Sequence, residues 1–242
     1  MSEPEPSPEN KPRRSRNRSR GRRRTKDSSD TEDSAQEPRP VAPTKAETAL
    51  LPPFSGVSPD EIYVPQTREE CWSAVDEIFA AGVTGFDTEA KPTFHVGQKS
   101  DGPHVAQFAL TDKAFIFQLH HPECEKAVAD LMASKEILKV GFGLRNDHKQ
   151  VQDRFGIRLN HVLDLDQVFK KMGYRGQIGV RGAIGVLLKQ GFKKSKSTTT
   201  SNWAMPTLTA KQLLYAANDA FAALKVMEAL KEQGLLESES ES

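Results

Sequence analysis

The sequence predicts one α/β domain in which a mixed β-sheet is flanked by helices. Two strand-like segments, His104–Leu110 and Ala114–Leu119, are joined by only three residues, which predicts a hairpin. Later strand-like segments alternate with helical ones, and this order of elements is typical of a mixed sheet covered by helices. The body that carries them, 46–236, has about 190 residues, which is enough to bury a sizeable core.

The elements around the hairpin follow from local signals. Thr67-Arg-Glu-Glu70 has the pattern of a capping box and predicts a helix that continues to Ala80. Val83–Glu89 is then predicted as a strand. Pro122 suits the first turn of a helix, which we expect to run through Met132.

The second half of the body alternates between strands and helices before it becomes wholly helical. Its predicted elements are a strand at Ile137–Phe142, a helix at Asn146–Phe155 ended by Gly156, a short strand at His161–Asp164, and a long helix from the capping box Thr209–Gln212 to about Gln233. Glycines recur at 173, 176, 179, 182 and 185. We expect them to form a flexible loop that leads into a helix around 183–190.

Residues 1–45 are predicted to be a disordered tail, because they contain only four apolar side chains and cannot offset the entropy of ordering. Ten of the sixteen residues in 11–26 are basic, whereas 27–37 holds five acidic residues and no basic one. The basic block is suited to auxiliary, sequence-independent contact with nucleic acid, or else solubilises the chain. The last six residues, 237–242, form a second, acidic tail.

Composition excludes several classes of protein. No apolar stretch is long enough to span a bilayer or to serve as a secretory signal. Two cysteines, Cys71 and Cys124, provide no disulfide framework and no zinc-binding pattern. We therefore expect an intracellular, cytoplasmic protein with no membrane partner, with a nuclear address in the basic block as the alternative. The net charge of +1 gives no information about partners.

Two carboxylates share one face of the first predicted strand. Asp87 and Glu89 are two residues apart and follow the apolar run Val83–Phe86. Carboxylates held together at the edge of a core repel each other, and a divalent metal ion is the usual remedy. The alternative is that one of them faces solvent at the end of the strand.

Two further acids lie where a metal site would need them. Asp147 stands at the start of the helix that follows the strand Ile137–Phe142. Asp219 lies among small apolar residues of the last helix, where a charge needs a partner. Tyr215 precedes Asp219 by four residues, so the phenol and the carboxylate share one face of that helix.

The three segments Gly85-Phe-Asp-Thr-Glu89, Gly141-Phe-Gly-Leu-Arg-Asn-Asp147 and Tyr215-Ala-Ala-Asn-Asp219 together resemble the DEDDy 3′–5′ exonucleases. That group includes the ribonuclease D and Werner-type exonuclease domains, which have the RNase H-like (DnaQ-like) fold. Ser201-Asn-Trp203 is also similar to an element of the family. The resemblance extends from about Val57 to Leu230.

The resemblance implies a role for each residue of the set. Asp87, Glu89, Asp147 and Asp219 match the four metal-binding carboxylates, and Tyr215 matches the residue that orients the attacking water. The sister subgroup places a histidine where this chain has Leu214, so the tyrosine version fits. Two Mg²⁺ or Mn²⁺ ions, about 3.5–4 Å apart, would then hold the scissile phosphate.

The expected activity is metal-dependent hydrolysis of terminal phosphodiester bonds at the 3′ end of DNA or RNA, with release of nucleoside monophosphates. The alternative is a catalytically weak or inactive RNase H-like module that binds nucleic acid. Outside the acidic set, Lys193-Lys-Ser-Lys196 is expected either to face solvent or to contact phosphates. Phe94 and His95 are expected either to stack on a base or to pack in the core or in a loop.

Overall fold

The structure is a computed structural model that describes residues 39–95 and 97–236. The disorder predicted for 1–45 therefore concerns residues outside these ranges, except for 39–45. The acidic tail predicted at 237–242 lies outside them as well. Within them, six strands form one sheet in the order β1-β4-β3-β2-β5-β6. The strands are β1 (Ile62–Tyr63), β2 (Val83–Glu89), β3 (Val105–Ala109), β4 (Ala114–Gln118), β5 (Leu138–Gly141) and β6 (Val162–Asp164).

The mixed sheet predicted from the order of the elements is confirmed. β2, β3 and β4 pair antiparallel, and the hairpin predicted between the last two is present. β5 pairs parallel to β2, β6 pairs parallel to β5, and β1 pairs parallel to β4. Asp87 on β2 lies directly opposite Gln107 on β3 in this register.

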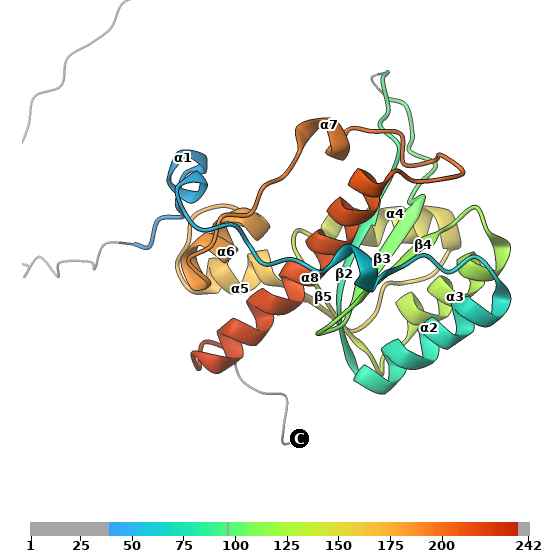
Figure 1. Ribbon diagram of the computed structural model, residues 1–242, viewed down its shortest axis with the longest axis horizontal. Helices are drawn as coiled ribbons and strands as arrows, with labels where there is room; N and C mark the ends of the chain where they lie inside the picture. The colour runs from blue at the N-terminus through green and yellow to red at the C-terminus, as the bar shows by residue number, and fades with distance from the viewer. Residues whose placement is uncertain (1–38, 96, 237–242) are drawn as a thin grey trace, which may run out of the picture. The chain divides into compact units, whose positions relative to one another are not determined.

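Helices cover both faces of the sheet (Figure 1). They are α1 (Lys45–Ala49), α2 (Arg68–Ala81), α3 (Pro122–Ala133), α4 (Arg145–Phe155), α5 (Leu165–Lys171), α6 (Gly179–Leu187), α7 (Lys196–Thr199) and α8 (Ala210–Glu232). On one face, α2, α3 and α4 pack against the aromatic side chains of β2–β4, including Phe86, Phe108 and Phe117. On the other face, α8 crosses the strands, and α5 and α6 pack beside its C-terminal half.

Both predicted capping boxes are confirmed. The side chain of Thr67 accepts a hydrogen bond from the Glu70 amide, and Thr209 does the same for Gln212 at the start of α8. Because these reciprocal bonds satisfy amides that have no partner inside the helix, they fix where α2 and α8 begin. Gly156 ends α4 in the left-handed conformation, also as predicted.

The boundary predicted at residue 45 is wrong, because residues of 39–45 contact the domain. Ala42 packs against the core between α6 and α8, and Thr44 caps α1, a helix that the sequence analysis did not predict. The two-residue strand β1 was also missed, because it is too short to show a pattern.

The glycine-rich segment is not a loop throughout, since α6 begins at Gly179 and includes Gly182 and Gly185. A Cβ at position 185 would lie 2.9 Å from the Cγ2 atom of Thr48. Glycine therefore allows α1 to approach α6 closely. The helix expected over 183–190 lies four residues earlier at its start, because packing against α1 and the core outweighs the low helix propensity of glycine.

The two cysteines meet in the fold. Cys71 on α2 and Cys124 on α3 form a disulfide, with their Cα atoms 5.6 Å apart and both side chains fully buried. They are 53 residues apart in sequence, so their meeting depends on how α2 and α3 pack and was not visible in their spacing.

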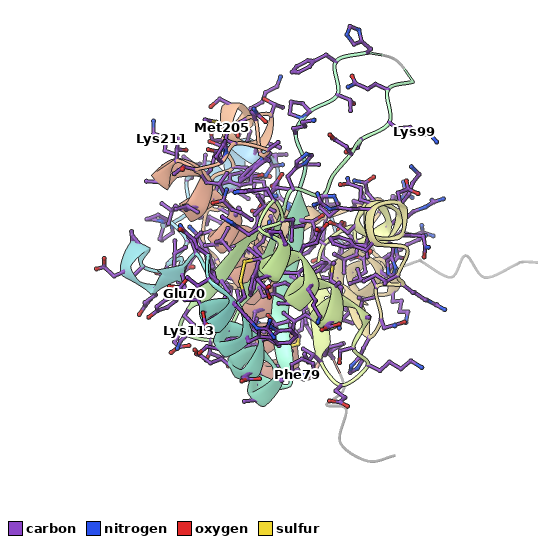
Figure 2. The ribbon with its side chains drawn as sticks, turned by 90° about the vertical axis from the view of Figure 1, so that its right-hand side faces the viewer. Glu70, Phe79, Lys99, Lys113, Met205 and Lys211 are labelled. Atoms are coloured by element: carbon purple, nitrogen blue, oxygen red, sulfur yellow. A yellow bond between two sulfur atoms is a disulfide. The ribbon has the colours of Figure 1, made fainter. Side chains whose placement is uncertain are left out.

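One segment extends away from the body. In Figure 2 the connection between β2 and β3, which carries Lys99, reaches beyond the helices. Phe94 lies on it and is 83 % exposed, so the alternative of core packing for this side chain is wrong. Among the helices that the structure describes, none is long and apolar enough to cross a membrane.

Candidate active site

The first two carboxylates of the site come from β2. Strand geometry directs Asp87 and Glu89 to the face covered by α8, while Phe86 between Gly85 and Asp87 is fully buried on the opposite face. The shared face predicted for the two acids is therefore confirmed.

Asp219 reaches these carboxylates because α8 lies very close to β2. A Cβ on residue 85 would overlap the carbonyl oxygen of Ala220, so glycine at this position permits the contact between helix and strand. As a result, one carboxylate oxygen each from Asp87, Glu89 and Asp219 lie within 4.8 Å of one another.

Asp147 is close to this group without belonging to it. It lies in the first turn of α4, and its Oδ1 atom accepts a hydrogen bond from the hydroxyl of Thr88. Thr88 stands between the two β2 carboxylates and points to the other face of the strand. The negative charge of Asp147 still raises the pKa of Asp87. The structure thus brings three of the four predicted carboxylates together and holds the fourth beside them.

Lys194 supplies a cation to the cluster. Its Nζ atom lies 2.8 Å from Oδ2 of Asp219 and 5.6 Å from the centre of the Tyr215 ring. The side chain of Lys194 is 41 % exposed, whereas that of Asp219 is 4 % exposed, so the lysine stem lies in solvent and its charged end reaches inward. The lysine run 193–196, expected to face solvent or to contact phosphates, thus also supplies a partner to a carboxylate of the site.

Burial and mutual repulsion disfavour ionisation of the carboxylates. Burial, and then the charges of Asp147 and Asp219, raise the pKa of Asp87 well above its ordinary value. Burial, together with the charges of Asp87 and Asp219, raises the pKa of Glu89 to about 9. Burial also raises the pKa of Asp219, although Lys194 opposes this effect. One ammonium therefore leaves the cluster with an excess of acidic groups.

These residues fit a divalent metal ion. Oδ1 of Asp219 is buried and accepts no hydrogen bond, which is costly for a carboxylate without a cation to bind it. Oxygen ligands from carboxylates are those that Mg²⁺ and Mn²⁺ prefer. The three converging oxygens are therefore chemically suited to hold such an ion.

Tyr215 lies one helical turn before Asp219, as the sequence predicts. The hydroxyl of Thr199 on α7 donates to its phenolic oxygen at 3.0 Å, and the ring packs against Trp203 with centroids 5.9 Å apart. Burial, and the charge of Asp219, raise the pKa of Tyr215 above its ordinary value. The phenol thus keeps its proton in neutral solution and is able to donate it in a hydrogen bond.

One cavity is lined by carboxylates of the cluster, and a second is lined by Tyr215. One, of about 450 Å³, is lined by Asp87, Asp219 and Lys194 together with Asp166 and Gln177. The other, of about 480 Å³, lies on the far side of Tyr215 and is lined by Phe54, Phe192, Lys193, Lys211 and Asn218. The two cavities differ in that three aspartates line the first, whereas the second has lysines and, among the residues that the structure describes, no acidic residue in its lining.

Comparison with known proteins gives a consistent result. The sequence profile of a 3′–5′ exonuclease family matches residues 63–234. The mouse bifunctional 3′–5′ exonuclease/ATP-dependent helicase WRN is 28 % identical over 154 residues, which cover 63 % of this chain and 11 % of that protein. A 3′–5′ exonuclease of Arabidopsis thaliana is 25 % identical over 150 residues, 61 % of this chain and 52 % of the relative. The chain therefore spans about half or less of the length of these relatives.

Solved structures share the fold. Trypanosoma brucei RNase D in complex with RNA U12 superposes with a TM-score of 0.62 at 19 % identity, covering 77 % of this chain and 64 % of that one. At this level of identity the likeness concerns the fold alone. It agrees with the RNase H-like sheet that the sequence motifs imply.

Proposed function

Because the chain belongs to the 3′–5′ exonuclease family, we propose that it is a metal-dependent nuclease that removes nucleotides from the 3′ end of a nucleic acid. The observation that carries this proposal is the convergence of Asp87, Glu89 and Asp219 within 4.8 Å beside Tyr215. A site of this kind destabilises the fold, because the carboxylates repel one another. A catalytic use explains why such a site is present.

Asp87, Glu89 and Asp219 would hold the metal ions, with Asp147 as the fourth carboxylate. When bound, two divalent ions supply activation of a water molecule and stabilisation of the departing 3′ oxygen. The products are a nucleoside monophosphate and a strand shortened by one nucleotide. No side chain is required to form a covalent bond to the substrate.

Tyr215 orients the attacking water. Its phenol remains protonated and is held from two sides, by the Thr199 hydroxyl at 3.0 Å and by the Trp203 ring. A donor that is fixed in this way loses little entropy when it bonds to the water.

We expect the substrate strand to enter the site along the cavity that contains lysines in its lining. Lys193 and Lys211 border the cavity beside Tyr215, and the aromatic side chains of Phe54 and Phe192 line the same cavity. Cations bind phosphates and rings stack on bases, so this cavity suits the last nucleotides of a single strand. The RNA bound to the structurally similar RNase D of T. brucei supports nucleic acid as the class of substrate.

The second candidate is a module that binds nucleic acid without turnover. Digestion of one oligonucleotide sequence, made as DNA and as RNA and labelled at its 5′ end, separates the two candidates. We expect a ladder of products shortened from the 3′ end with Mg²⁺ or Mn²⁺, and intact strands with a chelator. Binding without any shortening, in both metals and for both strands, would favour the binding module.

A further inference from the structure

Gln107 lies beside the acidic cluster, and the proposed reaction does not use its side chain. It lies on β3 directly opposite Asp87 on β2, and directly opposed residues of antiparallel strands have Cβ atoms about 4.5–5.5 Å apart on the same face. Its neighbours on that face, Val105 and Ala109, pack against Ala216 and Ala220 of α8. Gln107 is thus enclosed between the sheet and the helix that carries Asp219.

The amide of Gln107 is buried and has no partner. The residue is fully buried, and neither its Nε2 nor its Oε1 atom forms a hydrogen bond. An amide enclosed in this way destabilises the fold relative to an apolar side chain of the same shape. Apart from Asp87 opposite it, its neighbours on the sheet and on α8 are apolar, so a methionine or leucine would serve the packing better.

Gln118 shows what a buried glutamine with a structural role looks like in the same sheet. It lies on β4, on the face that β4 presents to α8, and is also buried. Its Nε2 atom donates to the carbonyl oxygens of Met205 at 3.0 Å and Pro206 at 3.2 Å. The difference between the two residues is therefore the presence of acceptors, not the degree of burial.

We propose that Gln107 is a positioning residue for the metal-binding carboxylates, and that its amide group donates to Asp87 when that carboxylate is ionised and holds a metal ion. Carboxylates that bind a metal are usually fixed by a second hydrogen bond from a residue behind them. Gln107 is the side chain opposite Asp87 and carries an unused donor. The inference rests on the proposed function, since it needs a metal ion at the cluster.

The inference makes stability and metal binding change in opposite directions. Gln107→Met removes a buried amide without a partner, so the melting temperature in a chelator should stay level or rise. The same change should weaken Mn²⁺ binding about 10-fold or more, which is the usual effect of removing such a support. Mn²⁺ binding is measured directly, by the electron paramagnetic resonance of the free ion, without reference to nuclease activity.

Gln118→Met is the matched control. It should lower the melting temperature, because Met205 and Pro206 lose their donor, and should leave Mn²⁺ affinity unchanged. Wild-type Mn²⁺ affinity in Gln107→Met would overturn the inference alone. So would a metal-free melting temperature that falls as it does in Gln118→Met, because the amide would then have a structural partner. Absence of Mn²⁺ binding by the wild-type protein would overturn the proposed function, and this inference with it.

Discussion

Two lysines reach inward on opposite faces of the same sheet, and their ammonium groups have different kinds of partner. Lys139 on β5 is fully buried, and its Nζ atom donates to the carbonyl oxygens of Leu131, Ser134 and Ile137 at 2.9–3.1 Å. Lys194 meets carboxylates instead, with Asp219 at 2.8 Å. The ammonium of Lys139 donates to carbonyl oxygens at and after the end of α3. The ammonium of Lys194 neutralises only part of a group of acids.

Their pKa values move in opposite directions. Burial lowers the pKa of Lys139 to about 8. Burial acts on Lys194 in the same sense, but the charges of Asp219 and Asp87 outweigh it and raise its pKa. Neutral carbonyls make a closed structural site around Lys139, whereas Lys194 stands among more acidic groups than one ammonium is able to neutralise. That excess of acidic groups is what we propose the metal ions neutralise.

The largest effect is expected from Asp87→Asn. Loss of one carboxylate from the cluster should lower the rate of nucleotide release at least about 10²-fold, because a large part of the electrostatic stabilisation depends on metal binding. The metal-free protein should be as stable as the wild type or more stable, since a repelling group is gone. Rates come from end-labelled strands, with Asp112→Asn in the β3–β4 turn as the control. Wild-type rates in a folded Asp87→Asn protein would rule out the site.

Lys139→Met tests the structural side of the comparison. It leaves three buried carbonyl oxygens without their donor, so the free energy of unfolding should fall by at least about 2 kcal/mol. Nuclease activity per folded molecule should not change. Urea denaturation measures the loss, and Lys126→Met on the exposed face of α3 is the control. A Lys139→Met protein as stable as this control would remove the structural half of the comparison.

Tyr215→Phe should have a milder effect than Asp87→Asn. The ring still packs on Trp203, and only the phenol that orients water is lost. We expect a lower kcat with nearly unchanged Mn²⁺ affinity and KM. Should KM rise steeply while kcat holds, Tyr215 would instead be a residue that binds substrate.

Lys194→Met should lower the metal-free melting temperature less than Lys139→Met does, because its side chain is partly exposed and Asp219 is able to take up a proton in response. Saturation with Mn²⁺ should remove the difference from wild type, since the metal ion replaces the missing cation. Lys193→Met serves as the neighbouring control. A deficit that persists in Mn²⁺ would show that Lys194 has a structural role like that of Lys139.

The last prediction concerns pH, and the sign of its effect on stability differs between the two regions. The pKa of Glu89 is about 9 in the fold against an ordinary 4.5, so between these values the native state binds more protons and the metal-free free energy of unfolding falls as pH rises. The pKa of Lys139 is about 8 against 10.5, so the unfolded state binds more protons there and stability recovers towards pH 10.5. Glu89→Gln should reduce the fall in the free energy of unfolding as pH rises, and Lys139→Met should reduce its later recovery. If the free energy of unfolding has the same pH dependence in these variants as in the wild type, the shifted pKa values of Glu89 and Lys139 are contradicted.

Most strands and helices that build the site were predictable, because their signals are local. The capping boxes at Thr67 and Thr209 and the hairpin between β3 and β4 each depend on a few adjacent residues. Asp87, Glu89 and Asp219 were predicted together for a different reason, since their three motifs match a known family in order.

Contacts between distant segments were not predictable. Lys194 belongs to a run of lysines whose pattern is that of an exposed segment, and only the path of the chain between α6 and α8 brings its Nζ atom to Asp219. The same holds for the pairing of Cys71 with Cys124 and for the docking of α1 on α6. The hydrogen bond that holds Asp147 at Thr88 likewise depends on side-chain placement, which sequence spacing does not determine.

The most direct test of the acidic cluster as a metal site is a Mn²⁺ titration of the wild-type protein and of Asp219→Asn. Asp219 lies on α8 and brings its carboxylate close to those of the two acids on β2. Its Oδ1 atom accepts no hydrogen bond within the protein. We expect the wild-type protein to bind Mn²⁺ and Asp219→Asn to bind it at least about 10-fold more weakly while it remains folded. Equal Mn²⁺ affinity in the two proteins, or no binding by the wild type, would contradict the account.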